Sequence, residues 1–355
     1  MSQFAGFTVD NGAIKDLRDL LFYTLYKDPD LNITATPVTG VINGQKLGYI
    51  DRMGDVGLNK CGCNPTYSNV DITGSEKEWE LGCWQIAKHI CYTELENTIA
   101  KNSLNKGTDI ANLIGTPYME FLTPLLQKAI TDMFWRIVWF GDKEAKNVAD
   151  SDGGNITKDI DISLFTIADG FFKRLFGIIA DNPGQKTAIS ANAETTTASQ
   201  MSKIREKGVA MGIIDNLLAD ADGRIFDKPD ACIMMTNSLF KALVADVRNT
   251  FIGTTLTYEQ LAEGVVISQY DGRKIIALDI WDRMIKRFEN NGTKLNNPHR
   301  AVLCSPSNLF YGTDDTDMIA DLSITFNEET RYNNIFAQSK IGTLIGEDDL
   351  VQVAI

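Results

Sequence analysis

The chain is poor in histidine and has no long apolar run. Of its 355 residues, only His89 and His299 are histidines. A Ser-His-Asp or Cys-His enzyme needs a positioned imidazole, and a catalytic zinc site usually takes two or three of them. No stretch approaches the roughly 20 apolar residues that a membrane helix needs. The sequence therefore argues against most hydrolytic and zinc-dependent chemistry and predicts no membrane span.

The chain also lacks the features of a secretory leader. Its first residues, MSQFAGFTVDNGAIKDLRDLL, show no basic stretch followed by an apolar core. We therefore expect a protein made and used in a reducing cytoplasm, where its cysteines remain thiols unless they bind a metal. The six cysteines are Cys61, Cys63, Cys83, Cys91, Cys232 and Cys304.

Positive charge is in short supply. The 34 basic residues are outnumbered by 47 acidic ones, which gives a net charge of −13. The excess is greatest in residues 305–355, where nine acids face Arg331 and Lys340, a net of −7. Such a surface repels phosphate, so the composition argues against tight, direct binding of nucleic acid. A solvated acidic face that aids solubility is an equally good explanation.

The first 100 residues predict a short helix, a long extended stretch and a return strand. Residues 13–27 place an apolar residue on one helical face at each turn, and Asp28-Pro29 ends that helix. Residues 31–75 are rich in Gly, Asn, Thr and Val and have no helical period. Residues 76–100 begin with the alternation of a strand, with Trp79, Leu81 and Cys83 on one side, and then pass into a helical segment expected near Tyr92–Ala100, with Cys91 at or near that helix. Free loops of about 45 residues are uncommon within compact domains, so residues 31–92 are expected to find their partners on adjacent copies.

Residues 124–140, PLLQKAITDMFWRIVWF, give the clearest helical signal. Thr123 is the expected N-cap, Pro124 the first helical residue, and Gly141 the residue just past the end. The broad apolar stripe of this segment predicts a buried helix that forms the axis of one domain.

The remainder predicts an α/β region followed by strands. Residues 141–155 form a polar linker and a candidate domain boundary. Asp271-Gly272 is a strong hairpin turn signal between two strands within 264–280. Further helices are expected at 163–179, 198–219 (capped by Thr196 or Thr197) and 237–249 (capped by Asn237), and further strands at 231–236, 300–305, 322–327, 331–345 and 350–355.

Cysteine spacing offers one candidate metal site. Cys61 and Cys63 are too close in sequence for the usual zinc knuckle, and Cys83 and Cys91 are eight residues apart, with His89 beside the second. Both pairs meet only if the extended stretch folds back on itself. We consider packed or idle thiols the better explanation, because a free cysteine behaves as a small apolar residue.

No motif predicts a catalytic or cofactor-binding residue. The phosphate-loop-like stretch at 181–187 lacks the contiguous Gly-Lys-Thr. The neighbouring acids Asp314, Asp315 and Asp317 arise readily by chance in so acidic a chain, and nothing indicates a cleft that would split their pKa values. We therefore expect a protein that is not an enzyme and has no cofactor.

The order of these elements resembles the major capsid protein of tailed bacteriophages, the Hong-Kong-97-type shell fold, and covers nearly the whole chain. IADGFFKRLFGI at 167–178 is similar to the segment that leads into the axial domain of such proteins. DGRKIIALDIWDRMI and HRAVLCSPSNLFYGTDD are similar to the hairpin and exit of that domain, and residues 322–355 to the closing strands of the peripheral domain. KCGCNPTYSNVDITGSEKEWELGCWQIAKHIC resembles the extended-loop region of capsid proteins from phages of gut bacteria.

The resemblance implies an α+β fold with four parts. They are an N-terminal arm (1–36), an extended β loop (37–92) with its distal part at 52–74, a peripheral domain with a long spine helix (93–155 and 300–355), and an inserted axial α/β domain (156–299). The lysine, asparagine and acid of the family's covalent cross-link do not match positions in this sequence.

The resemblance also implies a function and partners. The protein would self-assemble as hexamers and pentamers into an icosahedral head in the host cytoplasm. That head would enclose phage DNA without sequence-specific binding and would contact portal, scaffold and head-decoration or head-tail proteins. Two alternatives remain: an encapsulin-like bacterial compartment shell, and a cytosolic metalloprotein that uses Cys61, Cys63, Cys83, Cys91 or His89.

Overall fold

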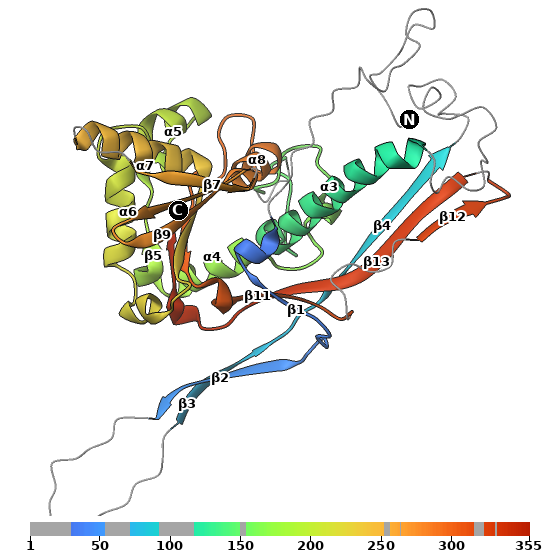
Figure 1. Cartoon of the computed structure of the whole chain (residues 1–355), viewed down its shortest axis with the longest axis horizontal. Helices are drawn as coiled ribbons and strands as arrows, with labels where there is room; N and C mark the ends of the chain where they lie inside the picture. The colour runs from blue at the N-terminus through green and yellow to red at the C-terminus, as the bar shows by residue number, and fades with distance from the viewer. Residues whose placement is uncertain are drawn as a thin grey trace, which may run out of the picture.

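The computed structural model describes residues 30–53, 72–91, 117–149, 154–251, 256–262, 264–315, 323–330 and 332–355. These residues form a seven-stranded sheet, a five-stranded sheet and a separate two-stranded hairpin (Figure 1). The strands are β1 (Thr36–Val38), β2 (Lys46–Met53), β3 (Ile72–Glu78), β4 (Gly82–Cys91), β5 (Lys186–Thr187), β6 (Cys232–Thr236), β7 (Tyr258–Ala262), β8 (Val265–Tyr270), β9 (Arg273–Leu278), β10 (Ala301–Cys304), β11 (Leu309–Thr313), β12 (Ser323–Asn327), β13 (Tyr332–Ile345) and β14 (Val351–Ala354). The α-helices are α3 (Pro117–Phe140), α4 (Phe171–Asp181), α5 (Thr197–Lys203), α6 (Val209–Ala219), α7 (Asn237–Thr250) and α8 (Asp279–Phe288).

The seven-stranded sheet has the order β5-β14-β10-β6-β9-β8-β7 and is covered on both faces. Side chains of its central strands alternate between two apolar clusters, as the period of two in a strand requires. Met234 and Val302 point into the cluster that α4 and α8 share, whereas Ile233 and Leu303 point into the cluster of α6 and α7. The sheet is therefore the middle layer of a three-layer α/β body.

Aromatic rings join this body to α3. The ring of Trp139, near the end of α3, lies 4.5 Å from the ring of Trp281 on α8 and 5.0 Å from that of Phe171 on α4 (centroid distances). Its Nε1 donates to Thr34 Oγ1 at 3.2 Å, just after the 3-10 turn η1 (Leu31–Ile33). Large buried rings contribute strongly to core stability, so this contact fixes α3 against the three-layer body.

Strand β13 organises the five-stranded sheet. One of its sides pairs with β4 from Tyr332↔Cys91 to Ile341↔Gly82. The other side pairs first with β12 and then with β11, and β11 pairs in parallel with β1. In Figure 1 this long sheet runs beside α3, away from the three-layer body.

The expectation that residues 31–92 lack partners in their own chain is wrong for two strands. β1 pairs with β11, and β4 pairs with β13 over ten residues. Cys91, which the sequence analysis places near a helix, lies in β4. Only β2 and β3 pair solely with each other within the described residues. Residues 1–29, the loop tip at 54–71 and the helical segment expected after Cys91 lie outside the described residues.

The helix expected at 124–140 begins earlier, at Pro117, so Pro124 lies inside it rather than at its start. Pro117 supplies the favoured proline at the first helical position, and Pro124, inside the helix, removes one backbone hydrogen bond and crowds the carbonyl four residues before it. Its end at Phe140 is as expected. Gly141 is required by space: a Cβ there would lie 2.2 Å from the carbonyl oxygen of Ala168.

Two other expected helices are wrong in extent. The segment at 163–179 forms a helix only from Phe171, because Gly170 crosses closely over Gly141 and the residues before it cannot continue a helix. The segment at 198–219 is divided into α5 and α6 by Gly208, whose φ of +83° suits glycine. Thr196 caps α5 as expected, in a capping box with Ser199.

The remaining strands are confirmed. Asp271 and Gly272 have φ of +47° and +71°, the left-handed pair that a tight hairpin turn needs. β6, β10, β12, β13 and β14 fall where the sequence predicts them. The expected boundary at residue 300 falls within one sheet, since β10 and β14 follow it and pair beside β6.

Candidate functional site

The β2–β3 hairpin is the first candidate surface, because it leaves the body. Figure 1 shows it extending beyond both sheets and α3. Its strands pair from Lys46↔Glu78 to Met53↔Ile72, with one irregularity between Ile50 and Arg52. Lys46 Nζ lies 2.9 Å from Glu76 Oε2 in an exposed ion pair, and such pairs contribute little to stability. A two-stranded hairpin alone in water is marginally stable at best, so this one needs a second surface.

The outer edge of β4 is the second candidate surface. Among the described strands, β4 pairs with β13 alone. Its other edge therefore presents backbone N–H and C=O groups that no described strand satisfies. Such an edge over ten residues is a template for a strand of another chain.

An apolar groove lies between β4, the stretch 126–136 of α3 and residues 163–167. It has a volume of about 540 Å³. The ring of Trp84 forms one wall and packs edge-to-face on Phe134, with the centroids 5.7 Å apart. The other apolar lining residues are Ile86, Ala87, Leu126, Ala129, Ile130, Met133, Leu164 and Ile167.

Large apolar side chains are also exposed at three separate places. Ile42 is 72% exposed at the base of the hairpin, and Phe336 is 40% exposed on β13. Phe251 and Tyr258 are 51% and 61% exposed around the end of α7 and the start of β7. Single exposed apolar residues need no explanation, but two of these places adjoin the hairpin or the β4 sheet.

The candidate metal ligands are not brought together as far as the structure describes them. Cys61 and Cys63 lie outside the described residues. Cys83 and Cys91 lie on the same straight strand, eight residues apart, so their Cα atoms are separated by about 27 Å. They are therefore too far apart to hold one ion within one chain. His89 is also on β4, and its ring packs on that of Tyr332 with centroids 4.6 Å apart.

Cys232 and Cys304 are buried thiols inside the seven-stranded sheet. Burial raises the pKa of Cys232 to about 12 and holds that of Cys304 well above its usual range. Because the thiolate is the reactive form, both act as core residues.

Ser238 and His299 form a pair that the sequence analysis did not identify. Ser238 Oγ lies 3.0 Å from His299 Nδ1, and His299 Nε2 lies 3.4 Å from the carbonyl oxygen of Gln200. A carbonyl only accepts, so Nε2 carries the proton and Nδ1 accepts from the serine hydroxyl. Burial lowers the pKa of His299 to about 4, so the ring is neutral at pH 7.

Asp282 completes this network but makes it unsuited to nucleophilic catalysis. Its carboxylate accepts from the amides of Asn237 (2.6 Å) and Ser238 (3.2 Å) at the start of α7. Burial raises the pKa of Asp282 to about 6, despite those hydrogen bonds. The carboxylate occupies the amides that would hold an oxyanion. The three side chains therefore stabilise a helix start.

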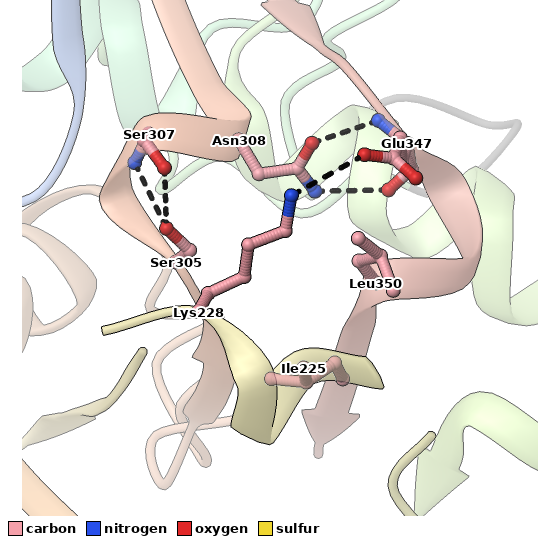
Figure 2. Close-up of a pocket in the computed structure, with 7 residues that line it drawn as sticks. All are labelled: Ile225, Lys228, Ser305, Ser307, Asn308, Glu347 and Leu350. Carbon is pink, nitrogen blue, oxygen red and sulfur yellow. Dashed lines mark hydrogen bonds and ion pairs between the residues drawn. The ribbon is translucent and has the colours of Figure 1, made fainter. Parts of the chain in front are cut away.

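A small pocket beside the last strand satisfies its own polar groups (Figure 2). Its volume is about 100 Å³. Asn308 Nδ2 donates to the carbonyl oxygen of Glu347 at 2.9 Å, and Glu347 N donates to Asn308 Oδ1 at 2.7 Å. Lys228 Nζ lies 3.8 Å from Glu347 Oε1. The pocket therefore joins the turn after β10 to the turn before β14 through hydrogen bonds between its own lining residues.

The acids near the end of β11 are likewise paired. Asp314 Oδ2 lies 2.7 Å from Lys340 Nζ, and Ser339 Oγ donates to Asp315 Oδ2 at 2.5 Å. Asp317 lies outside the described residues. In the part of the chain that the structure describes, no group of three His, Cys, Asp or Glu side chains has the geometry of a metal site, and no helix has the length and apolar character to cross a membrane.

Comparison with known proteins identifies the fold. No family model and no curated protein matches the sequence. The capsid of the empty GTA particle superposes with a TM-score of 0.51 at 10% identity, covering 99% of this chain and 96% of that chain. Chains of Mycobacterium phages Adephagia and Bobi each give 0.51 at 9% identity, covering 98% of this chain and 94% and 95% of theirs.

The chain has a phage capsid fold. The Hong-Kong-97-type class predicted from the sequence is therefore confirmed. At 9–10% identity the likeness lies in the backbone arrangement, so it shows the capsid fold and no residue's role.

Proposed function

We propose that this chain is a major capsid protein that self-assembles, as hexamers and pentamers, into the icosahedral head of a bacteriophage. The observation that carries the proposal is the projecting β2–β3 hairpin. It has no further partner strand among the described residues, and an isolated hairpin is at best marginally stable. A neighbouring copy is the simplest source of the missing surface.

The same body offers surfaces that a neighbour can cover. The open edge of β4 and the groove beside Trp84 both lie along β4. Contacts between a projecting element and a different surface of the next copy are heterologous, and such contacts close into rings when the rotation allows it. We propose that these contacts close into rings of five and six copies.

The charge of the chain suits an enclosing role. A net charge of −13 disfavours tight contact with packed DNA. We propose that the head encloses DNA without sequence-specific binding, and that the virion is assembled in the host cytoplasm. We also propose contacts with portal, scaffold and head-decoration or head-tail proteins, and the sequence resemblance is the only support for these partners.

The parts of the chain receive roles in this proposal. Residues 1–36 are the arm, 37–92 the extended loop, 93–155 and 300–355 the peripheral domain, and 156–299 the axial domain at the centre of each ring. The sheet pairing favours moving β10 and β14 from the peripheral to the axial domain, because β10 pairs with both β14 and β6. We propose no catalytic role, since Asp282 blocks the helix amides beside Ser238 and His299.

Deleting residues 53–74 tests the function. The deletion joins Arg52 to Ser75 and keeps the pair Tyr49↔Ser75, so residues 50–52 become a three-residue hairpin loop. We expect the full chain to form large particles in electron micrographs and the deleted chain to remain folded, by circular dichroism and melting, as small species. Particles of normal size without this segment would contradict the proposed role of the hairpin.

A further inference from the structure

The chain crosses the five-stranded sheet between β3 and β4. Residues 79–81 lie over β11 and β13 at the point where Gly312 pairs with Gly342. Two glycines directly opposite each other leave a strip of bare backbone. The segment that joins the hairpin to the body rests on that strip.

Both glycines are required by space, not by backbone conformation. Neither has a positive φ. A Cβ on Gly312 would lie 2.9 Å from Trp79 Cζ3 and 2.9 Å from Val41 Cγ2. A Cβ on Gly342 would lie 2.4 Å from the carbonyl oxygen of Glu80. Contacts this short force a side chain or the backbone to move.

Trp79 fixes the base of the hairpin through its ring and its backbone. The side chain is 4% exposed and packs with Val41 and Leu344 in a small cluster of its own. Gly44 N donates to the carbonyl oxygen of Trp79 at 2.8 Å, and Trp79 N donates to that of Gln45 at 3.0 Å. These bonds join the two segments at the base of the hairpin, the one before β2 and the one after β3, at Trp79, the residue that contacts Gly312.

Polar contacts on either side of Trp79 hold the same segment. Leu81 N donates to Asn43 Oδ1 at 2.8 Å, and Lys143 Nζ lies 2.8 Å from Glu80 Oε2. Lys77 is paired with Asp348 in the turn before β14. The exposed ion pairs are weak by themselves, but with the buried ring they anchor the hairpin to both sheets.

We propose that Trp79, seated on the Gly312–Gly342 pair, is a positioning residue that fixes the direction in which the hairpin leaves the body, and thereby its reach to a neighbouring copy. The second half of this inference rests on the proposed function. The first half concerns one chain only and can be tested without assembly.

Amide hydrogen exchange tests the contact of Trp79 with the Gly312–Gly342 pair directly. Gly312→Ala adds one methyl against Trp79 and Val41, so the amides of Gly44 and Trp79 should exchange at least tenfold faster while those of β6 and β10 stay unchanged. Gly48→Ala is the matched control, because a Cβ there meets nothing within 4 Å; it should leave exchange as in the wild type.

A variant in which the atoms around the new methyl are removed separates the effect of the Trp79–Gly312 contact from a general loss of stability. Val41→Ala with Trp79→Phe removes the three atoms nearest to the new methyl. Adding Gly312→Ala to this background should change exchange less than twofold, as expected for residues that act through one contact. An equal tenfold effect in both backgrounds, or no effect in either, would overturn the proposal.

Particle formation tests the second half. Gly48→Ala should give particles like those of the wild type, and Gly312→Ala should give none of normal size. Normal particles from Gly312→Ala, despite fast exchange at the seat, would refute the link to assembly. If the wild type forms no particles, the proposed function fails, while the exchange experiment still decides whether Trp79 fixes the hairpin.

Discussion

Asp282 and His299 lie on either side of Ser238 and respond to pH in opposite directions. The pKa of Asp282 is raised from 3.8 to about 6, so the folded state holds that proton more tightly and gains stability as pH falls from about 6 toward 4. The pKa of His299 is lowered from 6.5 to about 4, so the folded state loses stability as pH falls across a similar window. In the wild type the two effects offset each other.

Single substitutions should separate these effects. Relative to the wild type, Asp282→Asn should lose about 2 to 3 kcal/mol more stability between pH 6.5 and 4, because only the His299 effect remains. His299→Gln should shift the same pH slope in the other direction. Urea unfolding of the unassembled chain across this range measures both slopes. Parallel slopes in all three proteins would contradict this account of the network.

A buried charge pair, Glu289 and Arg300, lies between the end of α8 and the start of β10. Arg300 is fully buried, contacts the Glu289 carboxylate and lies over the ring of Phe172, 4.5 Å from its centroid. Glu289→Ala should cost about 3 to 5 kcal/mol, because it leaves the guanidinium buried without its counter-ion. Replacing both partners, as Glu289→Leu with Arg300→Met, should recover much of that loss in urea unfolding. A double variant no more stable than Glu289→Ala would argue that the loss in the single variant does not come from the unpaired Arg300 charge.

At the scale of elements, neighbouring helices cap one another. Asp246 on α7 accepts from the amides of Gly208 (3.0 Å), Ala210 (2.9 Å) and Met211 (3.2 Å) at the start of α6. Asp282 on α8 does the same for α7. Neither helix start has a side-chain cap of its own. Two aspartates, the buried Asp246 and the half-buried Asp282, therefore hold the starts of α6 and α7 against the next helix in the chain.

Removing the first of these caps should loosen α6. Asp246→Ala leaves three amides without an acceptor and should destabilise the chain by about 2 kcal/mol or more, whereas Asp246→Asn keeps an oxygen acceptor and should cost less. Exchange at the first turn of α6 should rise more than exchange in β6. Equal losses for both variants would mean that charge, rather than capping, matters at this position.

Local signals predicted the elements whose partners lie nearby in sequence. The Asp271-Gly272 turn, the Thr196 cap and the alternating strands after residue 300 all depend on neighbours within a few residues. α8 was missed because DIWDRMIKRF directly follows a strand without a break. The sequence predicts Asn237 as the cap of the helix at 237–249, but the acceptor for its first amides is Asp282, 45 residues later, and no local pattern shows that.

At the scale of the whole molecule, the resemblance of the sequence to a capsid family predicts the fold class, but the sequence does not show which strands pair. β4 joins β13 from about 250 residues away in sequence, a pairing that composition and period do not specify. The sequence does not predict the contact of Trp79 with Gly312 and Gly342, or the Ser238–His299 pair, for the same reason: each joins residues that are far apart in the sequence. Of the described strands within residues 31–92, only β2 and β3 pair with no strand of the rest of the chain, as the sequence led us to expect for the whole segment.

The central claim is that this hairpin finds its second surface on another copy. Electron cryomicroscopy of particles formed by the purified full chain tests it most directly. The account predicts closed shells in which the β2–β3 hairpin of each copy lies on a neighbour. A chain that stays monomeric at high concentration, or shells in which the hairpin folds onto its own body, would contradict it.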